Sequence, residues 1–512
     1  QTIDPFWHCE RTSSKMLVLY FVAIVVVLLI YYFRRKNSYW KNKGLPGPKP
    51  ILLFGNYKNA ALRRENSAET LRNIYNEFRN VPLIGMYRMT SPCILVADLD
   101  VIKNIMIKDF DKFQDRGVEF SKEGLGANLF HADGETWRVL RNKFSPLFTT
   151  SKLKNMTYLI EQKSDIIMEY LNDMITGTQE QEITKILRRY TCSTIASCAF
   201  GLEFDTISES LMAVLLKIDK LTLTCNPFHE IDMMFPGVLK KTNISLFPRD
   251  VSRFFDKMVS NVINERHGKP STRNDFMDII LEMREQKDLT YRQNNKVNDE
   301  DDLKLTLTDE VIAAQAFVFY IAGYETSATI LTYLLYELSR NPKIQNKLLE
   351  EIDEVMNRNK DEITYDSVYN NPYMEKVFNE VYRKYPIVPI FRKSNCDYKV
   401  PGMDFTIEKD TIILIPALGI HYDEKYYPDP KKFDPERFSP ENEQNRHSCA
   451  YLPYGVGPRN CIGEKITPLK IIVILILIKY EKVFISSRLN MLPLSPLGGI
   501  YVNIIPRNVK AQ

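Results

Sequence analysis

A single cysteine lies in a glycine-rich turn near the C-terminus, within the string Tyr454-Gly-Val-Gly-Pro-Arg459-Asn-Cys461-Ile-Gly463. The glycines let the backbone fold tightly and approach a flat object closely, because no Cβ intervenes. An apolar, helix-like run over 462–480 follows, and the N-terminus of a helix stabilises a thiolate through its free N–H groups and its dipole. Most lone cysteines are buried apolar side chains without chemistry, but this setting favours a soft anionic metal ligand at Cys461.

A second candidate group lies in the middle of a helix that the sequence predicts from Thr308 to Arg340. Thr308 is a candidate N-cap, and Asn341-Pro342 ends the helical pattern. Inside this helix stands the string Ala322-Gly-Tyr-Glu-Thr326. A threonine can return its hydroxyl to the carbonyl four residues earlier and bend the helix. On the residues alone, a structural kink and a catalytic hydroxyl are equally good interpretations.

Charged and aromatic pairs at helical spacing form the remaining candidates. Glu380 and Arg383 stand three residues apart, as in many surface ion pairs that contribute about 0.2–0.5 kcal/mol. Trp137 and Arg141 are one helical turn apart, so that an indole N–H and a guanidinium share a face. The alternative for this second pair is a core tryptophan beside a surface arginine. Neither pair establishes a function without the two motifs above.

Taken together and in this order, the motifs resemble those of the cytochrome P-450 superfamily, over residues 45–510. The cysteine string is similar to the family's haem-binding signature Phe-x-x-Gly-x-Arg-x-Cys-x-Gly, with Tyr454 in place of the phenylalanine. Two departures follow it: Lys465 replaces a frequent arginine, and Pro468 falls inside the next helix, where proline costs about 3 kcal/mol. That helix is therefore expected to start late or to kink. Finer strings resemble an insect microsomal class called family six, which oxidises plant toxins and insecticides; they cover 113–117, 147–150, 314–319, 426–430 and 433–442.

The resemblance implies a mainly α-helical fold with a small β region, the α+β cytochrome P-450 fold, and haem b as the cofactor. Cys461 would ligate the haem iron, where a thiolate favours O–O cleavage. Thr326 would help to deliver protons to the bound oxygen, Glu325 would support this relay, and Gly323 would leave room for the oxygen. The family also implies haem-propionate contacts from Trp137, Arg141, Arg116, Arg392 and Arg459, and a structural cluster of buried charges made by Glu380, Arg383 and Arg437 of the string Asp434-Pro-Glu-Arg437. The substrate pocket is expected to be lined by Phe120, Leu129, Val318, Phe319, Ala322, Val388 and Leu497.

The N-terminal part of the chain predicts a membrane anchor. Met16 to Phe33 are 18 residues without a charge, which is long enough to cross hydrocarbon as one helix. Arg34, Arg35 and Lys36 follow at once, which places the rest of the chain in the cytoplasm by the positive-inside rule. A cleaved signal peptide is less consistent with so long a run and a basic C-terminal flank. We therefore expect a leader or artificial segment over 1–15, a single-pass anchor in the endoplasmic reticulum membrane over 16–33, a basic and proline-rich hinge over 34–50, and one catalytic domain over 51–512.

The composition of the chain and the spacing of its apolar residues limit the classes of function and the secondary structure that it can have. A net charge of +4 on 512 residues, without a basic stripe or zinc-finger spacing, argues against nucleic-acid binding. Eight scattered cysteines without a C-x-x-C pair fit free thiols in a reducing compartment. The apolar spacing predicts a helix over 66–80, a β-hairpin of 83–89 and 93–97, and short strands over 398–415. The stretch 205–250 is weakly patterned, and in the family it helps to form the access lid.

We therefore expect a membrane-anchored monooxygenase that oxidises apolar small molecules. Electrons are expected from NADPH through a separate NADPH-cytochrome P-450 reductase, since the chain has no flavin or dinucleotide motif; cytochrome b-five is a second candidate donor. Candidate docking positions for an acidic reductase are Arg138, Lys143, Lys152 and Lys465. Three alternatives remain open: a monooxygenase of hormone or lipid synthesis, a reductase-independent isomerase or dehydratase, and a haem protein without catalysis. The intact Gly323, Glu325 and Thr326 argue against the isomerase.

Overall fold

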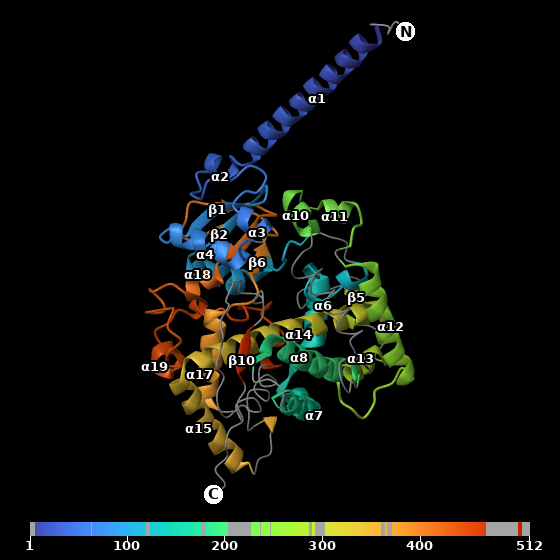
Figure 1. Cartoon of the computed structure of the whole chain (residues 1–512), viewed down its shortest axis with the longest axis vertical. Helices are drawn as coiled ribbons and strands as arrows, with labels where there is room; N and C mark the ends of the chain where they lie inside the picture. Colours follow the sequence, from blue (N-terminus) through green and yellow to red (C-terminus); the bar gives the residue numbers. More distant parts are fainter. Residues whose placement is uncertain are drawn as a thin grey trace, which may run out of the picture.

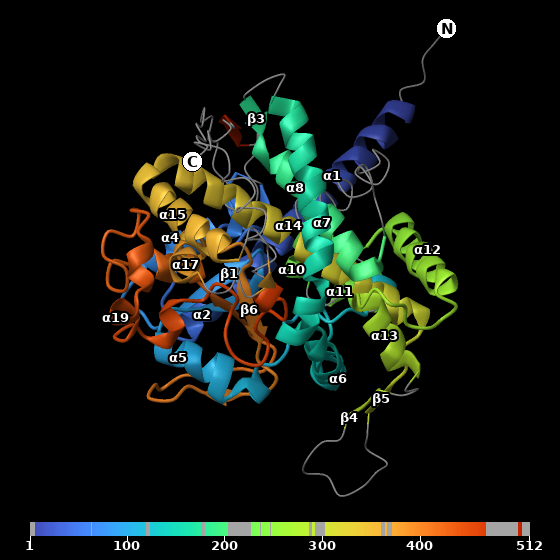
Figure 2. The same cartoon turned by 90° about the horizontal axis from the view of Figure 1, so that it is seen from below.

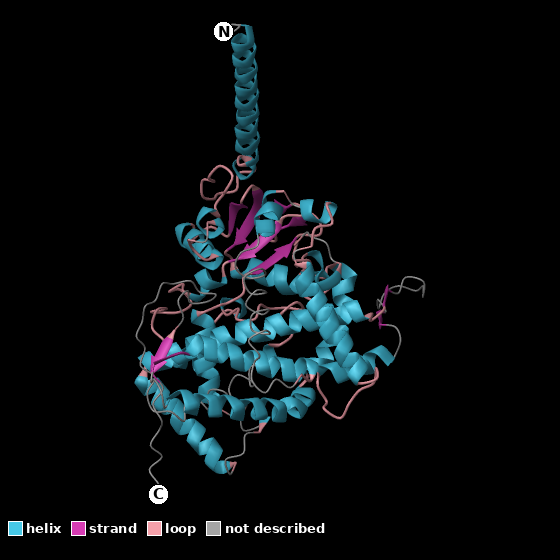
Figure 3. Ribbon diagram, turned by 45° about the vertical axis from the view of Figure 1, so that its right-hand side comes forward, coloured by secondary structure: helices cyan, strands magenta, loops and turns pink. Residues whose placement is uncertain are grey.

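Helices make up most of the molecule, with a small sheet near the end from which the first helix projects (Figure 1 and Figure 3). The computed structural model describes residues 6–62, 64–118, 123–175, 180–202, 227–235, 237–245, 247–285, 289–291, 303–359, 364–365, 371–466 and 500–503. The α-helices are α1 (Phe6–Lys36), α2 (Tyr39–Asn42), α3 (Lys58–Ala61), α4 (Ser67–Glu77), α5 (Leu99–Lys103), α6 (Gly134–Phe144), α7 (Thr150–Ile175), α8 (Ile183–Phe200), α10 (Pro227–Met234), α11 (Val238–Lys241), α12 (Arg249–Glu265), α13 (Phe276–Glu285), α14 (Asp309–Arg340), α15 (Pro342–Arg358), α17 (Pro372–Lys384), α18 (Ala417–His421) and α19 (Pro440–Glu443). The strands are β1 (Leu83–Arg88), β2 (Ser91–Val96), β3 (Glu180–Glu182), β4 (Leu289–Tyr291), β5 (Leu303–Leu305), β6 (Ile390–Lys393), β7 (Tyr398–Lys399), β8 (Thr406–Ile407), β9 (Ile412–Ile415) and β10 (Tyr501–Asn503).

The four-stranded sheet joins two distant parts of the chain in the order β1-β2-β9-β6. The predicted hairpin is confirmed, because β1 and β2 pair antiparallel with Leu83 opposite Val96. Its turn, Met89-Thr90, carries a positive φ of 53° at Met89. The strands predicted over 398–415 are found as β7, β8 and β9, and β9 runs parallel to β2. The helix expected over 66–80 is α4, which is shorter at both ends.

The long helix α14 crosses the middle of the helical part, next to α8 (Figure 1 and Figure 2). Its predicted bounds are confirmed: the Thr308 side chain caps it by accepting from the N–H of Val311 at 3.3 Å. It ends at Arg340, and Pro342 opens α15. At 32 residues it is about 48 Å long. Because it packs against α8, α12 and α17, about two thirds of its residues are buried.

A helix long and apolar enough to cross a membrane leads away from this body (Figure 1 and Figure 3). Within Met16–Lys36 an 18-residue window has a mean hydropathy of 2.8, and Arg34, Arg35 and Lys36 form the last turn of the helix. The helix α1 already begins at Phe6, so its start does not coincide with the start of the apolar run.

The segment that we expected to be a hinge packs against the sheet instead. Trp40 is only 4% exposed, and its Nε1 donates to the carbonyl of Met86 in β1 at 2.9 Å. The backbone N–H of Trp40 donates to the hydroxyl of Tyr87 at 3.0 Å. A Cβ at Gly85 would lie 2.6 Å from Cγ of Trp40, so the indole fits only because β1 has a glycine there. The connection between α1 and the body is therefore docked.

Several expectations fall outside the described residues. They concern Phe120 and Leu497 in the pocket, the kink at Pro468 and most of the helix that follows Cys461, and the 203–226 part of the weakly patterned stretch.

Candidate active site

The cysteine turn has the tight geometry that its glycines predict. Gly455 and Gly457 take positive φ values of 72° and 78°. A Cβ at Gly457 would lie 1.9 Å from the carbonyl oxygen of Met106, so this position can only be glycine. The N–H of Cys461 donates to the carbonyl of Tyr454 at 3.0 Å. The turn is thereby closed, and it leaves Cys461 exposed, as a metal ligand requires.

Helix α6 is fastened to this turn through Arg141. Its Nη1 donates to the carbonyl of Asn460 at 2.8 Å, and its Nη2 donates to the Asn460 side chain at 2.7 Å. Arg141 therefore holds the residue next to Cys461. One helical turn earlier, Trp137 is 4% exposed and packs against Phe110, with 5.4 Å between the ring centroids.

Three arginines, Arg116, Arg392 and Arg459, form what we call the arginine cradle. Arg392 and Arg459 are each 3% exposed, and the Nε atoms of both lack a hydrogen-bond partner among the described residues. Burial, with Arg459 nearby, lowers the pKa of Arg392 to about 9. Burial, with Arg459 and Arg392 nearby, also lowers the pKa of Arg116 well below its ordinary value. Like charges buried together with unsatisfied donors call for an anion.

The cradle also holds a stretch of backbone. Arg459 donates to the carbonyls of Gln114, Phe130 and Ala132, and its guanidinium lies 4.9 Å from the Trp137 ring centroid. Arg116 donates to the same Phe130 carbonyl at 2.7 Å. These residues fit haem: the cradle supplies buried cations for its two propionates, and an exposed cysteine stands beside them. Contact of the propionates with Trp137, Arg141, Arg116, Arg392 and Arg459 remains a prediction. Among these residues, Arg141 binds Asn460 and Trp137 packs against Phe110.

A narrow accessible stripe interrupts the buried surface of α14. It includes Val318, Ala322 and Thr326, spaced four residues apart, with Ala322 exposed and the other two half-buried. Ile321 and Gly323, on either side of Ala322, are also half-buried. The Thr326 hydroxyl donates to the carbonyl of Ala322 at 2.5 Å, as its position in a helix allows. The oxygen keeps its lone pairs free to accept a hydrogen bond from the accessible side.

The side chain of Glu325, and the side of Gly323 on which a Cβ would lie, face α8. Arg188 of α8 donates through Nε and Nη2 to both carboxylate oxygens of Glu325, at 3.0 and 2.6 Å. A Cβ at Gly323 would lie 2.6 Å from Cδ1 of Ile195, also on α8. The missing side chain of Gly323 thus lets the two helices approach, and the room for oxygen that we expect at Gly323 stays a prediction.

The expected cluster of buried charges is present. Glu380 and Arg383 are fully buried, and Arg383 donates to both carboxylate oxygens at 2.7 and 2.9 Å. Nε of Arg437 lies 3.5 Å from the same carboxylate. Removing one partner of such a cluster leaves an uncompensated buried charge and costs about 3–5 kcal/mol.

His421, which the sequence reasoning missed, connects this cluster to the cysteine turn. Arg383 Nη1 donates to the His421 carbonyl at 2.7 Å, and His421 Nδ1 lies 3.0 Å from the Arg383 carbonyl. His421 Nε2 accepts from the N–H of Leu452 at 2.9 Å. Burial, with Arg383 nearby, lowers the pKa of His421 to about 3, so the ring is neutral and carries its proton on Nδ1. Nothing in its sequence surroundings sets this histidine apart.

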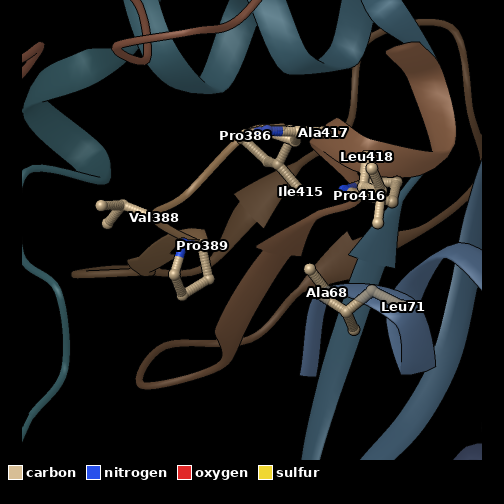
Figure 4. A pocket seen from close by; sticks show the side chains of 9 residues that line it. All are labelled: Ala68, Leu71, Pro386, Val388, Pro389, Ile415, Pro416, Ala417 and Leu418. Atoms are coloured by element: carbon tan, nitrogen blue, oxygen red, sulfur yellow. The ribbon is translucent and has the colours of Figure 1, made fainter. Parts of the chain in front are cut away.

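The expected pocket residues have different surroundings. Val318 and Ala322 lie on the accessible stripe and stay predictions, as does the buried Leu129. Phe319 does not lie on the stripe: its ring is buried in the core, 5.6, 5.4 and 6.0 Å from the rings of Phe144, Phe148 and Phe276. Val388 is 50% exposed. It lies at the edge of a small hollow, with its side chain directed away from the other lining residues, Ala68, Leu71, Pro386, Pro389, Ile415, Pro416, Ala417 and Leu418 (Figure 4).

Comparison with known proteins agrees with this geometry. The family model of cytochrome P-450 matches residues 45–486. The chain is 49% identical to cytochrome P-450 6B6 of Helicoverpa armigera, over 92% of this chain and 95% of the relative. It is 47% identical to cytochrome P-450 6B1 of Papilio polyxenes, over 92% of this chain and 95% of the relative. It is 35% identical to cytochrome P-450 6k1 of Blattella germanica, over 83% of this chain and 83% of the relative. The chain therefore belongs to the cytochrome P-450 family, with its closely similar relatives in insect family six, and it is a haem-thiolate monooxygenase.

Proposed function

We propose that this monooxygenase oxidises apolar xenobiotics, such as plant toxins and insecticides. The observation that carries the proposal is the composition of the accessible stripe. Val318 and Ala322 offer hydrocarbon, and Thr326 adds one hydroxyl whose proton is already directed to the backbone. A surface of this kind binds molecules by apolar contact and gives a polar or charged substrate little to bind. The resemblance to family six supports the same substrate class.

The residues around the haem site divide the work of the reaction. Haem, when bound through Cys461, supplies the chemistry that inserts one oxygen atom into an unactivated C–H bond. The cradle would bind the propionates, and the cysteine turn would present the thiolate. Thr326 holds a proton at Oγ1 next to the substrate surface, and Glu325, ion-paired with Arg188, supports proton movement from behind the helix.

We further propose that electrons reach the site from NADPH through cytochrome P-450 reductase, with cytochrome b-five as a second donor, at the endoplasmic reticulum membrane. Helix α1 and its basic last turn support a single-pass anchor with a cytoplasmic catalytic domain. The cations near the cysteine turn support docking of an acidic partner: Lys143 shares α6 with Arg141, and Lys465 is exposed four residues after Cys461. Arg138 of the same helix is engaged with Asp111 at 2.6 Å.

The first test is the carbon monoxide difference spectrum of the reduced, membrane-expressed protein, beside Cys461→Ser. Thiolate ligation predicts a strongly red-shifted Soret band that Cys461→Ser abolishes. A band at the position of histidine-ligated haem in the unsubstituted protein would overturn the assignment of the ligand.

The second test addresses substrate and electron source. The protein is reconstituted with reductase and NADPH, and a panel of apolar plant toxins, insecticides, steroids and fatty acids is incubated under isotopically labelled O₂. Products that carry one labelled oxygen and require both reductase and NADPH support the proposal. Turnover of the steroids or fatty acids alone would support synthesis of endogenous compounds, and turnover of peroxides without reductase would support an isomerase.

A further inference from the structure

A short loop, residues 124–132, packs against α14 on the N-terminal side of the accessible stripe. It starts with the 3₁₀ turn η3 (Gly124–Gly126), which packs on α14. The loop is organised from inside by Asn128, whose side chain is fully buried. Its Nδ2 donates to the carbonyl of Leu125 at 2.6 Å, and its Oδ1 accepts from the N–H groups of Phe130 and His131 at 3.0 and 3.1 Å. These bonds hold the backbone of residues 125–131 together.

One buried side chain of α14 binds two backbone groups of this loop, on either side of Asn128. Gln315 is 0% exposed. Its Oε1 accepts from the N–H of Leu129 at 2.9 Å, and its Nε2 donates to the carbonyl of Ala127 at 2.9 Å. The NH₂ group of the Gln315 amide thus faces a carbonyl, and its oxygen faces an N–H group, so the orientation of the amide is fixed. A buried pairing of this kind is specific in position, because any displacement of the loop leaves polar groups unsatisfied.

The helical period places Gln315, although it is buried, on the same face of α14 as the accessible stripe. Ala322 follows it by seven residues and Thr326 by eleven, which are two and three turns of helix. Seven residues correspond to about 10 Å along the axis. Gln315, which holds the backbone of the loop, therefore lies about 10 Å from Ala322 along the helix axis, on the N-terminal side of the stripe.

We propose that Gln315 is a positioning residue that sets the size and shape of the substrate pocket by fixing the 124–132 loop over α14. The inference rests on the proposed oxidation of apolar molecules at the stripe. It concerns which apolar molecules fit into the substrate pocket. Without the two hydrogen bonds the loop is free to shift along α14, so that the pocket loses a defined boundary and accommodates bulky molecules differently.

The other end of the loop is held independently, which makes the effect local. The carbonyl of Phe130 accepts from Arg116 and Arg459 at 2.7 and 3.2 Å, and Ala132 accepts from Arg459. These bonds do not involve Gln315, and Cys461 lies on a separate turn. Substitution of Gln315 therefore leaves thiolate ligation intact while it releases the α14 side of the loop.

The experiment compares the haem-loaded protein with Gln315→Met, which is similar in length and makes neither hydrogen bond. Amide hydrogen exchange is measured for a peptide that covers 124–132. Binding of two azoles is followed spectrally: imidazole, which is small enough to reach the iron without touching the loop, and 1-benzylimidazole, which extends into the pocket. Thr332→Val is the matched control, because Thr332 is also fully buried on α14 but donates only locally, to the Ala328 carbonyl at 2.7 Å.

We expect exchange of the Leu129 amide to become about tenfold faster in Gln315→Met. The dissociation constant of 1-benzylimidazole should change by about tenfold, and that of imidazole by less than about twofold. Thr332→Val should leave all three unchanged. Unchanged exchange and unchanged azole binding in a Gln315→Met protein that keeps its thiolate spectrum would overturn the proposal.

If Gln315→Met lacks the thiolate spectrum, Gln315→Asn, which keeps the amide on a shorter side chain, is measured in the same way. Loss of the spectrum in both variants would also overturn the proposal, because Gln315 would then belong to the haem-binding core. The proposed oxidation of apolar molecules and the positioning role of Gln315 can be contradicted independently of each other. Absent product formation with reductase and NADPH, beside the expected azole and exchange differences, would remove the proposed function and leave the positioning role standing.

Discussion

Arg392 shows how a single residue can be unfavourable in the protein alone and favourable once a ligand arrives. Its guanidinium is buried near Arg459, its Nε has no partner among the described residues, and its pKa is lowered to about 9. Arg141 is the opposite case, because both of its Nη atoms are engaged with Asn460. The two arginines lie at the same site, and we expect opposite consequences when each is replaced.

Arg392→Met should make the haem-free protein more stable and the haem less tightly held. Removing an uncompensated buried charge stabilises by about 1–4 kcal/mol, and losing a charge-assisted bond to a propionate weakens haem binding by about 1.5–3 kcal/mol. Thermal unfolding of haem-stripped protein and the rate of haem transfer to an acceptor protein measure the two effects. Arg141→Met is the control and should destabilise the haem-free protein, because Asn460 loses its donors. A haem-free Arg392→Met protein that is less stable than the unsubstituted one would contradict this account.

At the scale of elements, the contact between α8 and α14 determines what the central motif of α14 can do. Ile195 of α8 fills the space that the missing side chain of Gly323 leaves, and Arg188 binds Glu325. Two residues of the motif thus depend on a neighbouring helix that is more than 120 positions earlier in the chain. The side chain of Thr326 lies on the accessible stripe with those of Ala322 and Val318.

Gly323→Ala should destabilise the protein through Ile195 rather than through the haem. Overpacking costs about 1–3 kcal/mol, and the gain in helix propensity returns about 1 kcal/mol, so we expect a net loss of up to about 2 kcal/mol. Ile195→Val removes the Cδ1 atom that a new Cβ would meet, and it should restore most of this loss in the double variant. Denaturant unfolding of the two single variants and the double variant gives the coupling. If turnover falls in Gly323→Ala and Ile195→Val does not restore it, the earlier expectation of room for oxygen is correct.

The sequence predicts those features that depend on local pattern and spacing. The bounds of α14, the β1–β2 hairpin and the cluster of Glu380, Arg383 and Arg437 follow from capping residues, alternation and family motifs, and the structure confirms them. Features that depend on which distant part of the chain packs against a residue are not predicted from the sequence. The roles of Gly323, Phe319 and His421 belong to this second group.

Gln315 and Trp40 illustrate the physical reason for the difference. A buried glutamine and a tryptophan beside prolines carry no periodic signal, and each acquires its role from a partner far along the chain. Gln315 binds a loop 186 positions away, and Trp40 binds a strand 46 positions away. No local propensity encodes such pairs, because their energy comes from burial and from hydrogen bonds that exist only in the folded chain.

At the scale of the whole molecule, the segment that joins α1 to the body forms one unit with the body. Trp40 is buried against β1, and the side chains of Tyr39 and Lys43 both bind Glu408 in the turn between β8 and β9. The buried indole contributes far more than the ion pair, because Lys43 and Glu408 are 35% and 46% exposed and such pairs contribute about 0–1 kcal/mol.

Trp40→Ala should therefore release the segment, and Glu408→Gln should not. Loss of a buried tryptophan side chain costs about 3–5 kcal/mol, which exceeds what the exposed contacts around it supply. Limited trypsin treatment of membrane vesicles reports the difference, because cleavage after Lys41 or Lys43 separates the body from α1. We expect rapid release for Trp40→Ala and slow release for Glu408→Gln and the unsubstituted protein. Equal rates for all three would mean that the segment is accessible despite its docking.

The docked tryptophan also bears on which compounds the enzyme meets. Only Asn37 and Ser38 separate the end of α1 from α2, and two residues span at most about 7 Å. With α1 in the bilayer, as proposed, the body cannot drift away as on a long tether; it stays against the lipid surface in one orientation. The concentration that matters to the pocket is then that of compounds dissolved in lipid. Partition between water and membrane becomes a first stage of selectivity, acting before any side chain touches the substrate.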